Sequence, residues 1–321
     1  MGSRRTGYVL CAVAAPLFAL AGIVGTIAIQ GGFPALGLAA FRTYGGAILL
    51  LPFVLLALRR FPRRSIIPIA LYAAIGIVAS QGMYFEAIGR MGVALPLVIS
   101  YLAPLMVAVY QRLRLGERLP PYAYAAMVTA VGGVGIVVLT GSGGIGALPV
   151  EGLLLSLGVA ITFAIQLILG ARQPTEVGAF ARAGASLAVA SLMWLVLVPI
   201  WTLPFDVVDQ SAQLAGRIDA AVPVWSSLLW LMVLGSAVPF ALVLAGAVRI
   251  GAGAASMIAM IEPIAGTLLA WAVLGQALTG WQLAGIAIAV GGVAIVEQAR
   301  IRRIRTVEML EAVPLVGPED R

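Results

Sequence analysis

The chain has 321 residues, of which 62% are hydrophobic and only 10% are charged, whereas a soluble globular protein carries about 25% charged residues. This composition excludes a water-soluble globule, and the single cysteine, Cys11, excludes a disulfide-stabilised secreted fold. The sequence contains no histidine, so the common zinc, haem and Ser-His catalytic sites are not expected. We therefore predict an integral membrane protein with no enzymatic activity, no metal site and no cofactor.

Ten apolar stretches are long enough to cross the hydrocarbon core of a bilayer, which takes about 20 residues of α-helix. Lipid cannot satisfy free backbone groups, and no stretch alternates between polar and apolar residues as barrel strands do, so each is predicted to be a helix. The predicted fold is an all-α integral membrane protein with ten transmembrane helices. In chain order these helices cover residues 8–28, 34–57, 66–88, 93–112, 121–140, 152–171, 177–200, 223–247, 252–274 and 279–298.

The basic residues are all arginines, and alternate loops share them unevenly. With ten spans the two termini lie on one side, which holds fifteen arginines, while the other side holds only Arg90 and Arg217. Cytoplasmic loops carry the positive excess, so both termini are predicted to face the cytoplasm. Arginines spread over many loops favour contact with membrane lipids over a nucleic-acid partner. Their exclusive use suggests a bacterial gene, and hence the bacterial inner (plasma) membrane.

The sequence contains an internal repeat. Shifting the chain by 159 positions aligns residues 90–137 with 249–296 without a gap, and fifteen of the 48 pairs are identical, including four glycines and one proline. Each half therefore holds five spans, and because five is odd, the second half enters the membrane inverted. We predict two inverted five-helix repeats, 1–145 and 146–300, and a cytoplasmic tail, 301–321. Such repeats place a substrate site near the bilayer midplane, between the halves.

Short motifs at equivalent places in the two halves resemble those of a known family. They are Tyr84-Phe85-Glu86-Ala87-Ile88-Gly89-Arg90, Leu102-Ala103-Pro104, Leu115-Gly116-Glu117-Arg118-Leu119, Ile261-Glu262-Pro263, Leu274-Gly275-Gln276 and Gly291-Gly292. Each half resembles an EamA repeat, and the whole is similar to a ten-span, EamA-type member of the drug/metabolite transporter superfamily. The resemblance implies ATP-independent transport of small metabolites through a central cavity formed by spans 1–4 and 6–9. Gln276 departs from the pattern, because members usually carry glutamate there.

Glu262 is the clearest candidate for a functional side chain. It lies near the middle of predicted span 9, where an ionisable group costs at least a few kcal/mol. Its helical neighbour Gly266 is small, which suits a face turned towards other helices. A carboxyl group at this place could carry a coupling proton or bind a substrate amine, and the alternative is one fixed hydrogen bond between helices.

Arg42, in predicted span 2, is the matching cation, and a weaker upstream match pairs it with Arg182 in span 7. Arginine binds carboxylates bidentately, so Arg42 could hold a substrate carboxylate or pair with Glu262. For Arg182 the sequence favours snorkelling to the cytoplasmic interface. Uncharged residues at depth complete the predicted substrate-binding set, which comprises Arg42, Gln81, Tyr84, Tyr101, Gln166, Glu262 and Trp271.

Two further patterns have structural interpretations. Glu86 and Arg90 lie four residues apart near the outer end of span 3 and predict a helix-end pair or a gate contact. Small residues four apart, Ala126-Ala130 and Gly285-Ala289, allow close helix approach, either within the monomer or in a dimer.

The predicted function is secondary transport of small metabolites by alternating access, as an exporter of amino acids or related compounds, with Glu262 in proton coupling. The alternatives are efflux of drugs or cations by the same fold, or, in a different class, an intramembrane enzyme or a non-transporting scaffold. The predicted partners are a small-molecule substrate and membrane lipids, and the protein is expected to be a monomer or a homodimer.

Overall fold

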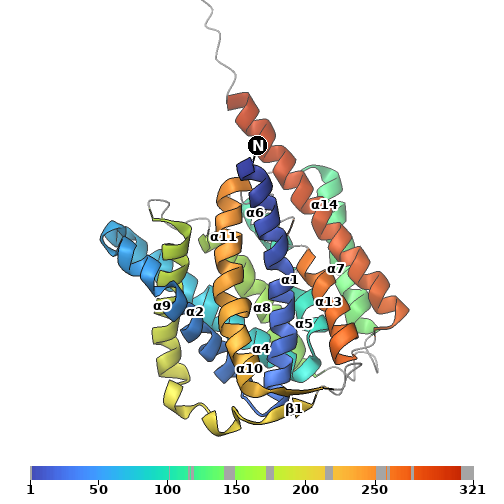
Figure 1. Ribbon diagram of the computed structural model, residues 1–321. Helices are drawn as coiled ribbons and strands as arrows, with labels where there is room; N and C mark the ends of the chain where they lie inside the picture. Colours follow the sequence, from blue (N-terminus) through green and yellow to red (C-terminus); the bar gives the residue numbers. More distant parts are fainter. Residues whose placement is uncertain are drawn as a thin grey trace, which may run out of the picture.

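The computed structural model describes residues 2–100, 102–114, 116, 119–140, 149–170, 177–213, 220–250, 258, 261–275 and 278–311. The fold is almost entirely helical (Figure 1). Its α-helices are α1 (Gly2–Gln30), α2 (Ala35–Ala57), α3 (Ile66–Leu71), α4 (Ser80–Met91), α5 (Ala94–Ser100), α6 (Ala103–Arg114), α7 (Pro121–Leu139), α8 (Val150–Gly170), α9 (Ala179–Leu197), α10 (Val224–Met232), α11 (Val238–Ile250), α13 (Ile261–Leu274) and α14 (Gly280–Glu311).

In the part of the chain that the structure describes, seven helical segments are long and apolar enough to cross a membrane. They are Arg5–Gln30, Ala35–Arg60, Arg63–Met91, Ala94–Arg114, Val150–Gly170, Ala179–Leu197 and Val224–Val243. Two shorter apolar helical stretches, Pro121–Val137 and Gly280–Val296, fall within the predicted fifth and tenth spans. Helix α13 lies within the predicted ninth. The protein therefore crosses the membrane several times.

Two π-helical segments interrupt the third and eighth predicted spans. They are η3 (Tyr72–Ala79), which joins α3 to α4, and η7 (Val233–Ala237), which joins α10 to α11. The 159-residue offset of the repeat places 233–237 on 74–78, so both halves carry the same irregularity at the same place. π-Helical turns are rare and often mark functional sites. The apolar runs gave no indication of either segment.

The fourth span differs from the continuous helix expected over 93–112. Helix α5 ends at Ser100 and α6 begins at Ala103, with Pro104 as its second residue. Proline disrupts the hydrogen bonding of a helix interior but is tolerated in a first turn, so the helix restarts there. The repeat offset places Pro104 on Pro263, so the helix of the ninth span, α13, carries a proline at the equivalent position.

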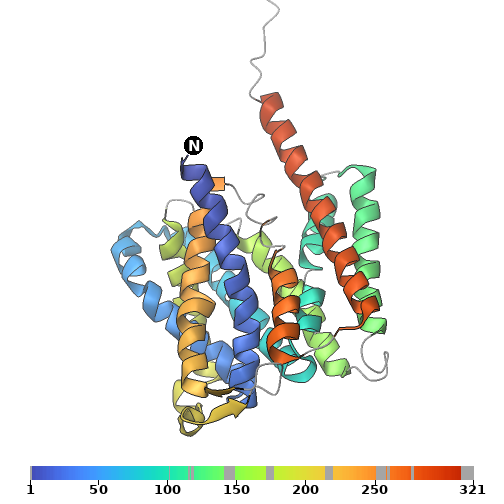
Figure 2. The same cartoon turned by 45° about the vertical axis from the view of Figure 1, so that its right-hand side comes forward.

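Helices α7 and α14 pack closely along their length, as Figures 1 and 2 show from two directions. A Cβ atom added at Gly133 would lie 2.5 Å from the backbone nitrogen of Ala289, and one at Gly292 would lie 2.6 Å from the backbone oxygen of Ala126. The small residues at these positions therefore let the two backbones touch. Of the two uses that the sequence left open, packing within one chain is the one observed.

The two ends of the helical part lie at the same end of the molecule. The start of α1 and the C-terminal end of α14 lie towards the same end in both views, and α14 projects beyond the other helices (Figures 1 and 2). Helix α14 continues to Glu311, so the first part of the predicted 301–321 tail is helical. At the opposite end, a two-stranded antiparallel hairpin, β1 (Ser211–Gln213) and β2 (Ala221–Pro223), lies between α9 and α10.

Candidate functional site

Arg42 is the most completely bound polar side chain of the interior. It lies on α2, is only 5% exposed, and its guanidinium nitrogens each donate a hydrogen bond. Nε donates to Ser236 Oγ at 2.9 Å, one terminal nitrogen to Gln81 Oε1 at 3.0 Å, and the other to the Gly235 carbonyl oxygen at 2.5 Å. Gly235 and Ser236 belong to the π-helix η7 of the second half. Arg42 therefore links the two halves of the chain in the membrane interior.

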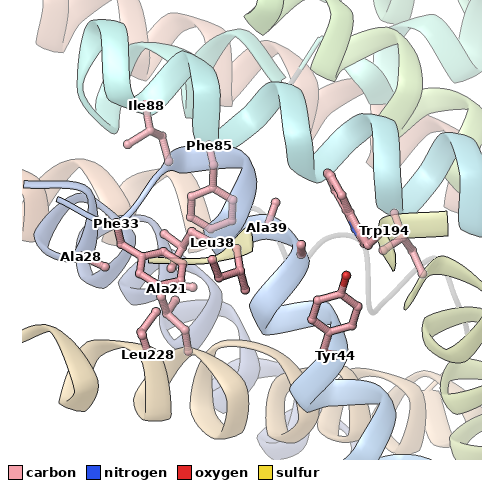
Figure 3. Packing of buried hydrophobic residues seen from close by; sticks show 14 of the residues in the cluster. Ala21, Ala28, Phe33, Leu38, Ala39, Tyr44, Phe85, Ile88, Trp194 and Leu228 are labelled. Atoms are coloured by element: carbon pink, nitrogen blue, oxygen red, sulfur yellow. The ribbon is translucent and has the colours of Figure 1, made fainter. Parts of the chain in front are cut away.

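The Phe85 ring forms the apolar wall beside this guanidinium. The Arg42 Cζ atom lies 5.4 Å from the ring centroid, within the range of a cation–π interaction. Phe85 is fully buried in a cluster with Leu38 and Ala39 of α2, towards which its ring points (Figure 3). A side chain at Gly25 of α1 would collide with this ring. Phe85 thus shields Arg42 from lipid and water while stabilising its charge.

Gln81, Tyr84 and Phe85 share one face of α4, because residues three and four apart are neighbours on a helix. The Tyr84 hydroxyl lies 3.0 Å from where a Cβ of Gly22 would be, so the absence of a side chain on α1 makes room for it. Tyr84 also packs edge-on against Phe85, with 5.6 Å between ring centroids. The three side chains bring α4 into contact with α1 and α2.

Glu262 lies in the first turn of α13 and is partly buried. It interacts electrostatically with both Arg42 and Tyr84. One turn further along, a Cβ on Gly266 would lie 2.5 Å from Leu97 of α5 and 3.6 Å from Ala19 of α1. This face of α13 is therefore turned towards protein. Arg42, Gln81, Tyr84 and Glu262 form what we call the central cluster.

The other predicted site residues lie elsewhere. Gln166, on α8, is 8% exposed and donates from Nε2 to the Tyr72 hydroxyl at 3.2 Å, at the opposite end of the third span from Tyr84. Trp271 lies on α13 and is 42% exposed. Tyr101 lies outside the described residues. Trp194, on α9, is 2% exposed and lies in the main hydrophobic cluster.

Arg90 forms a second polar link between the halves. It forms an ion pair with Glu86 one turn earlier on α4, and another with Glu151, in the first turn of α8, at 2.9 Å. Glu86 was expected, whereas Glu151 was not, because it lies 61 residues away in the sequence. In the predicted orientation, the ion pair between Arg90 and Glu151 lies at the end of the third span that faces away from the cytoplasm.

The sequence did not single out Ser236, the Gly235 carbonyl or Phe85. A Gly-Ser step inside the apolar run Met232–Pro239 was the available signal for the first two. Phe85 had none, because an aromatic residue in an apolar span is ordinary. Among the described residues, no group of three acidic or cysteine side chains could hold a metal ion.

These observations define a multi-pass helical membrane protein with repeated halves joined through a buried arginine. The sequence matches the EamA-like transporter family over residues 5–139 and again over 150–297. The chain belongs to this family, which points to a membrane transporter of the drug/metabolite type. The family model thus matches the chain twice, in succession.

Two individual proteins are similar to this chain. The uncharacterized transporter YvbV of Bacillus subtilis (strain 168) is 25% identical over 268 residues, which cover 82% of each protein. A solved crystal structure with 22% sequence identity superposes with a TM-score of 0.59, covering 94% of this chain and 99% of that one. The second similarity is one of fold.

Proposed function

We propose that this protein is a ten-helix secondary transporter of the bacterial plasma membrane, with both termini in the cytoplasm. It exports amino acids or related small metabolites by alternating access, and the two halves move about the central cluster. The first half contributes Arg42, Gln81 and Tyr84 to the central cluster, and the second half contributes Glu262. The π-helix η7 of the second half lies beside the cluster and accepts hydrogen bonds from Arg42. Inverted repeats bind substrate at such an interface, where irregular helices meet.

The observation that carries this proposal is a buried arginine, Arg42, within electrostatic range of a partly buried glutamate, Glu262, of the other half. Arg42 suits a carboxylate and Glu262 suits an ammonium group. An α-amino acid presents both groups on adjacent atoms. Its binding would replace the Gly235 and Ser236 partners of Arg42, and so would release the link between the halves. Substrate binding and movement are coupled in this way.

Counterflow in proteoliposomes tests the proposal. The purified protein is reconstituted with one unlabelled amino acid inside, and uptake of the same labelled amino acid is followed for neutral, acidic and basic members. Accumulation above protein-free liposomes supports the proposal. Uptake confined to hydrophobic cations, with no amino acid accepted, would contradict it and favour cation efflux. No uptake of either class by a monodisperse protein would favour a scaffold.

Glu262→Gln is expected to remove proton coupling while retaining exchange. Glutamine keeps the size of the side chain and a carbonyl oxygen that accepts hydrogen bonds, but its amide does not bind and release a proton as a carboxyl group does. Uptake by the wild-type protein should respond to an imposed pH gradient, and uptake by the variant should not, while counterflow at equal pH continues. Equal responses to the gradient in both proteins would remove Glu262 from the coupling mechanism.

Glu151→Gln is expected to change the exchange rate by up to about fivefold, since an exposed ion pair contributes about 0.2–1 kcal/mol. Glu151 holds α8 to α4 through Arg90, and movement of the halves has to break this contact. Glu86→Gln is the matched control, because Glu86 pairs with Arg90 inside one helix. The measurement is the counterflow rate of each variant relative to the wild-type protein. Equal effects would mean that the contact does not control movement.

A further inference from the structure

A second arginine within a predicted span, the half-buried Arg182 on α9, lines a cavity of about 80 Å³. The cavity is several times larger than the ~10–15 Å³ that one water molecule needs. Its polar lining comes from Arg182, Tyr72 of η3 and Ser186 of α9, and its apolar lining includes Ile77, Leu187 and Phe240. The Arg182 Nε atom is buried and has no hydrogen-bond partner among the described residues. From the sequence, Arg182 was expected to snorkel to the cytoplasmic interface of the membrane.

This cavity is the repeat-related counterpart of the Arg42 site. Arg182 pairs with Arg42 in the weaker upstream match. The 159-residue offset, continued upstream of residue 90, places Ile77 on Ser236 and Phe240 on Gln81. Ser236 and Gln81 are the two side chains that accept hydrogen bonds from Arg42. At Arg182 their places are taken by residues without acceptors.

The two sites therefore differ in what satisfies the guanidinium. At Arg42 the protein itself supplies acceptors for all its nitrogens, whereas at Arg182 a cavity adjoins a buried N–H group. A buried donor without a partner carries a free-energy cost, which is larger when the donor is charged. An external acceptor in the cavity would remove this cost.

The donors around the cavity determine the charge of that acceptor. The Tyr72 oxygen accepts a hydrogen bond from Gln166 at 3.2 Å, which leaves its O–H free to donate into the cavity. Arg182 interacts electrostatically with Tyr72 as well. None of the described lining residues is acidic. The fixed positive charge of Arg182 disfavours a cation here, whereas a small anion finds this charge and a hydroxyl donor.

We infer that the Arg182 cavity binds a small carboxylate group, at a site separate from the central cluster. The planar guanidinium matches a carboxylate, and the Tyr72 hydroxyl provides a further donor. Gln166, predicted from the sequence as a substrate residue, orients Tyr72 at this site. In the predicted orientation the site lies towards the cytoplasmic ends of α8 and α9, where an exported metabolite would enter. The binding itself does not depend on transport.

Thermal denaturation of the purified protein in detergent tests this site. Sodium acetate is the probe, and HEPES, too bulky for the cavity, is the only other anion. The wild-type protein should show a saturable rise in melting temperature. Arg182→Gln should weaken the apparent affinity at least about tenfold, as expected for loss of a charge-assisted hydrogen bond. Arg249→Gln, the same change at an exposed arginine, should behave as wild type.

A second variant tests the site without removing Arg182. Phe240→Gln places at this position the residue type, glutamine, that accepts a hydrogen bond from Arg42 at the equivalent position, Gln81. The new side chain should accept a hydrogen bond from Arg182 and so weaken acetate binding at least about tenfold. Identical acetate responses in wild type, Arg182→Gln and Phe240→Gln would overturn the inference, and so would saturable stabilisation by sodium chloride alone.

Discussion

Arg42→Gln is expected to reduce amino-acid counterflow at least about 100-fold. Truncating one partner of a buried, hydrogen-bonded charge pair costs about 2–5 kcal/mol, and Arg42 has three protein acceptors as well as the nearby Glu262. Glutamine can satisfy one or two of the acceptors but supplies no charge for a substrate carboxylate. The measurement is the initial rate of uptake over a range of substrate concentrations.

Arg42→Lys separates charge from geometry. Lysine keeps the positive charge but has no planar fork to reach Gly235, Ser236 and Gln81 together, so an intermediate rate with a raised KM is expected. Arg249→Gln serves again as the control for loss of an arginine. If Arg42 were only a structural link, both variants would lower the melting temperature and leave KM unchanged in the protein that remains folded. That outcome would remove Arg42 from the substrate site.

The charge pattern and the repeat predicted most of the architecture, because both signals survive in an apolar sequence. An arginine or glutamate at depth is costly, so its position is informative. Arg42 and Gln81 were predicted as site residues 39 positions apart, and the structure joins them by a hydrogen bond. The shared proline and glycines gave the register of the halves, with which both family matches agree.

The rotation of each helix could not be predicted in the same way. Residues that face lipid and residues that face other helices are both apolar, so hydrophobic periodicity does not separate them. For this reason the sequence missed Phe85 as the wall of the Arg42 site. It also grouped Gln166 with Tyr84, although Gln166 bonds to Tyr72. The π-helices depend on tertiary contacts, which a uniform apolar run does not encode, whereas Pro104 was the available signal for the break before Ala103.

The same repeat yields two roles for two arginines. Arg42 is fully bound by the protein and joins the halves, while Arg182 borders a cavity and keeps an unsatisfied Nε. The difference comes from two positions of the repeat. Ser236 and Gln81 lie beside Arg42, whereas their counterparts beside Arg182 are Ile77 and Phe240. A duplicated unit has therefore diverged through the neighbours of its arginine rather than through the arginine itself.

Adjacent glycines in α7 and α14 give a prediction with internal controls. In each Gly-Gly pair, a Cβ on the first glycine meets nothing within 4 Å, whereas a Cβ on the second strikes the partner helix. At Gly133 the nearest atoms are backbone atoms of Ala289 and Gly285, 2.5 and 2.6 Å away. Backbone atoms cannot rotate aside as a side chain can, so the helices must separate.

Gly133→Ala and Gly292→Ala are therefore expected to destabilise the protein relative to Gly132→Ala and Gly291→Ala. Overpacking costs about 1–3 kcal/mol, and comparison within each pair cancels the gain of about 1 kcal/mol that alanine brings to a helix. Melting temperatures in detergent should fall for the second glycine and stay level or rise for the first. Unchanged melting temperatures with an altered oligomeric state would instead assign this face to contacts between chains.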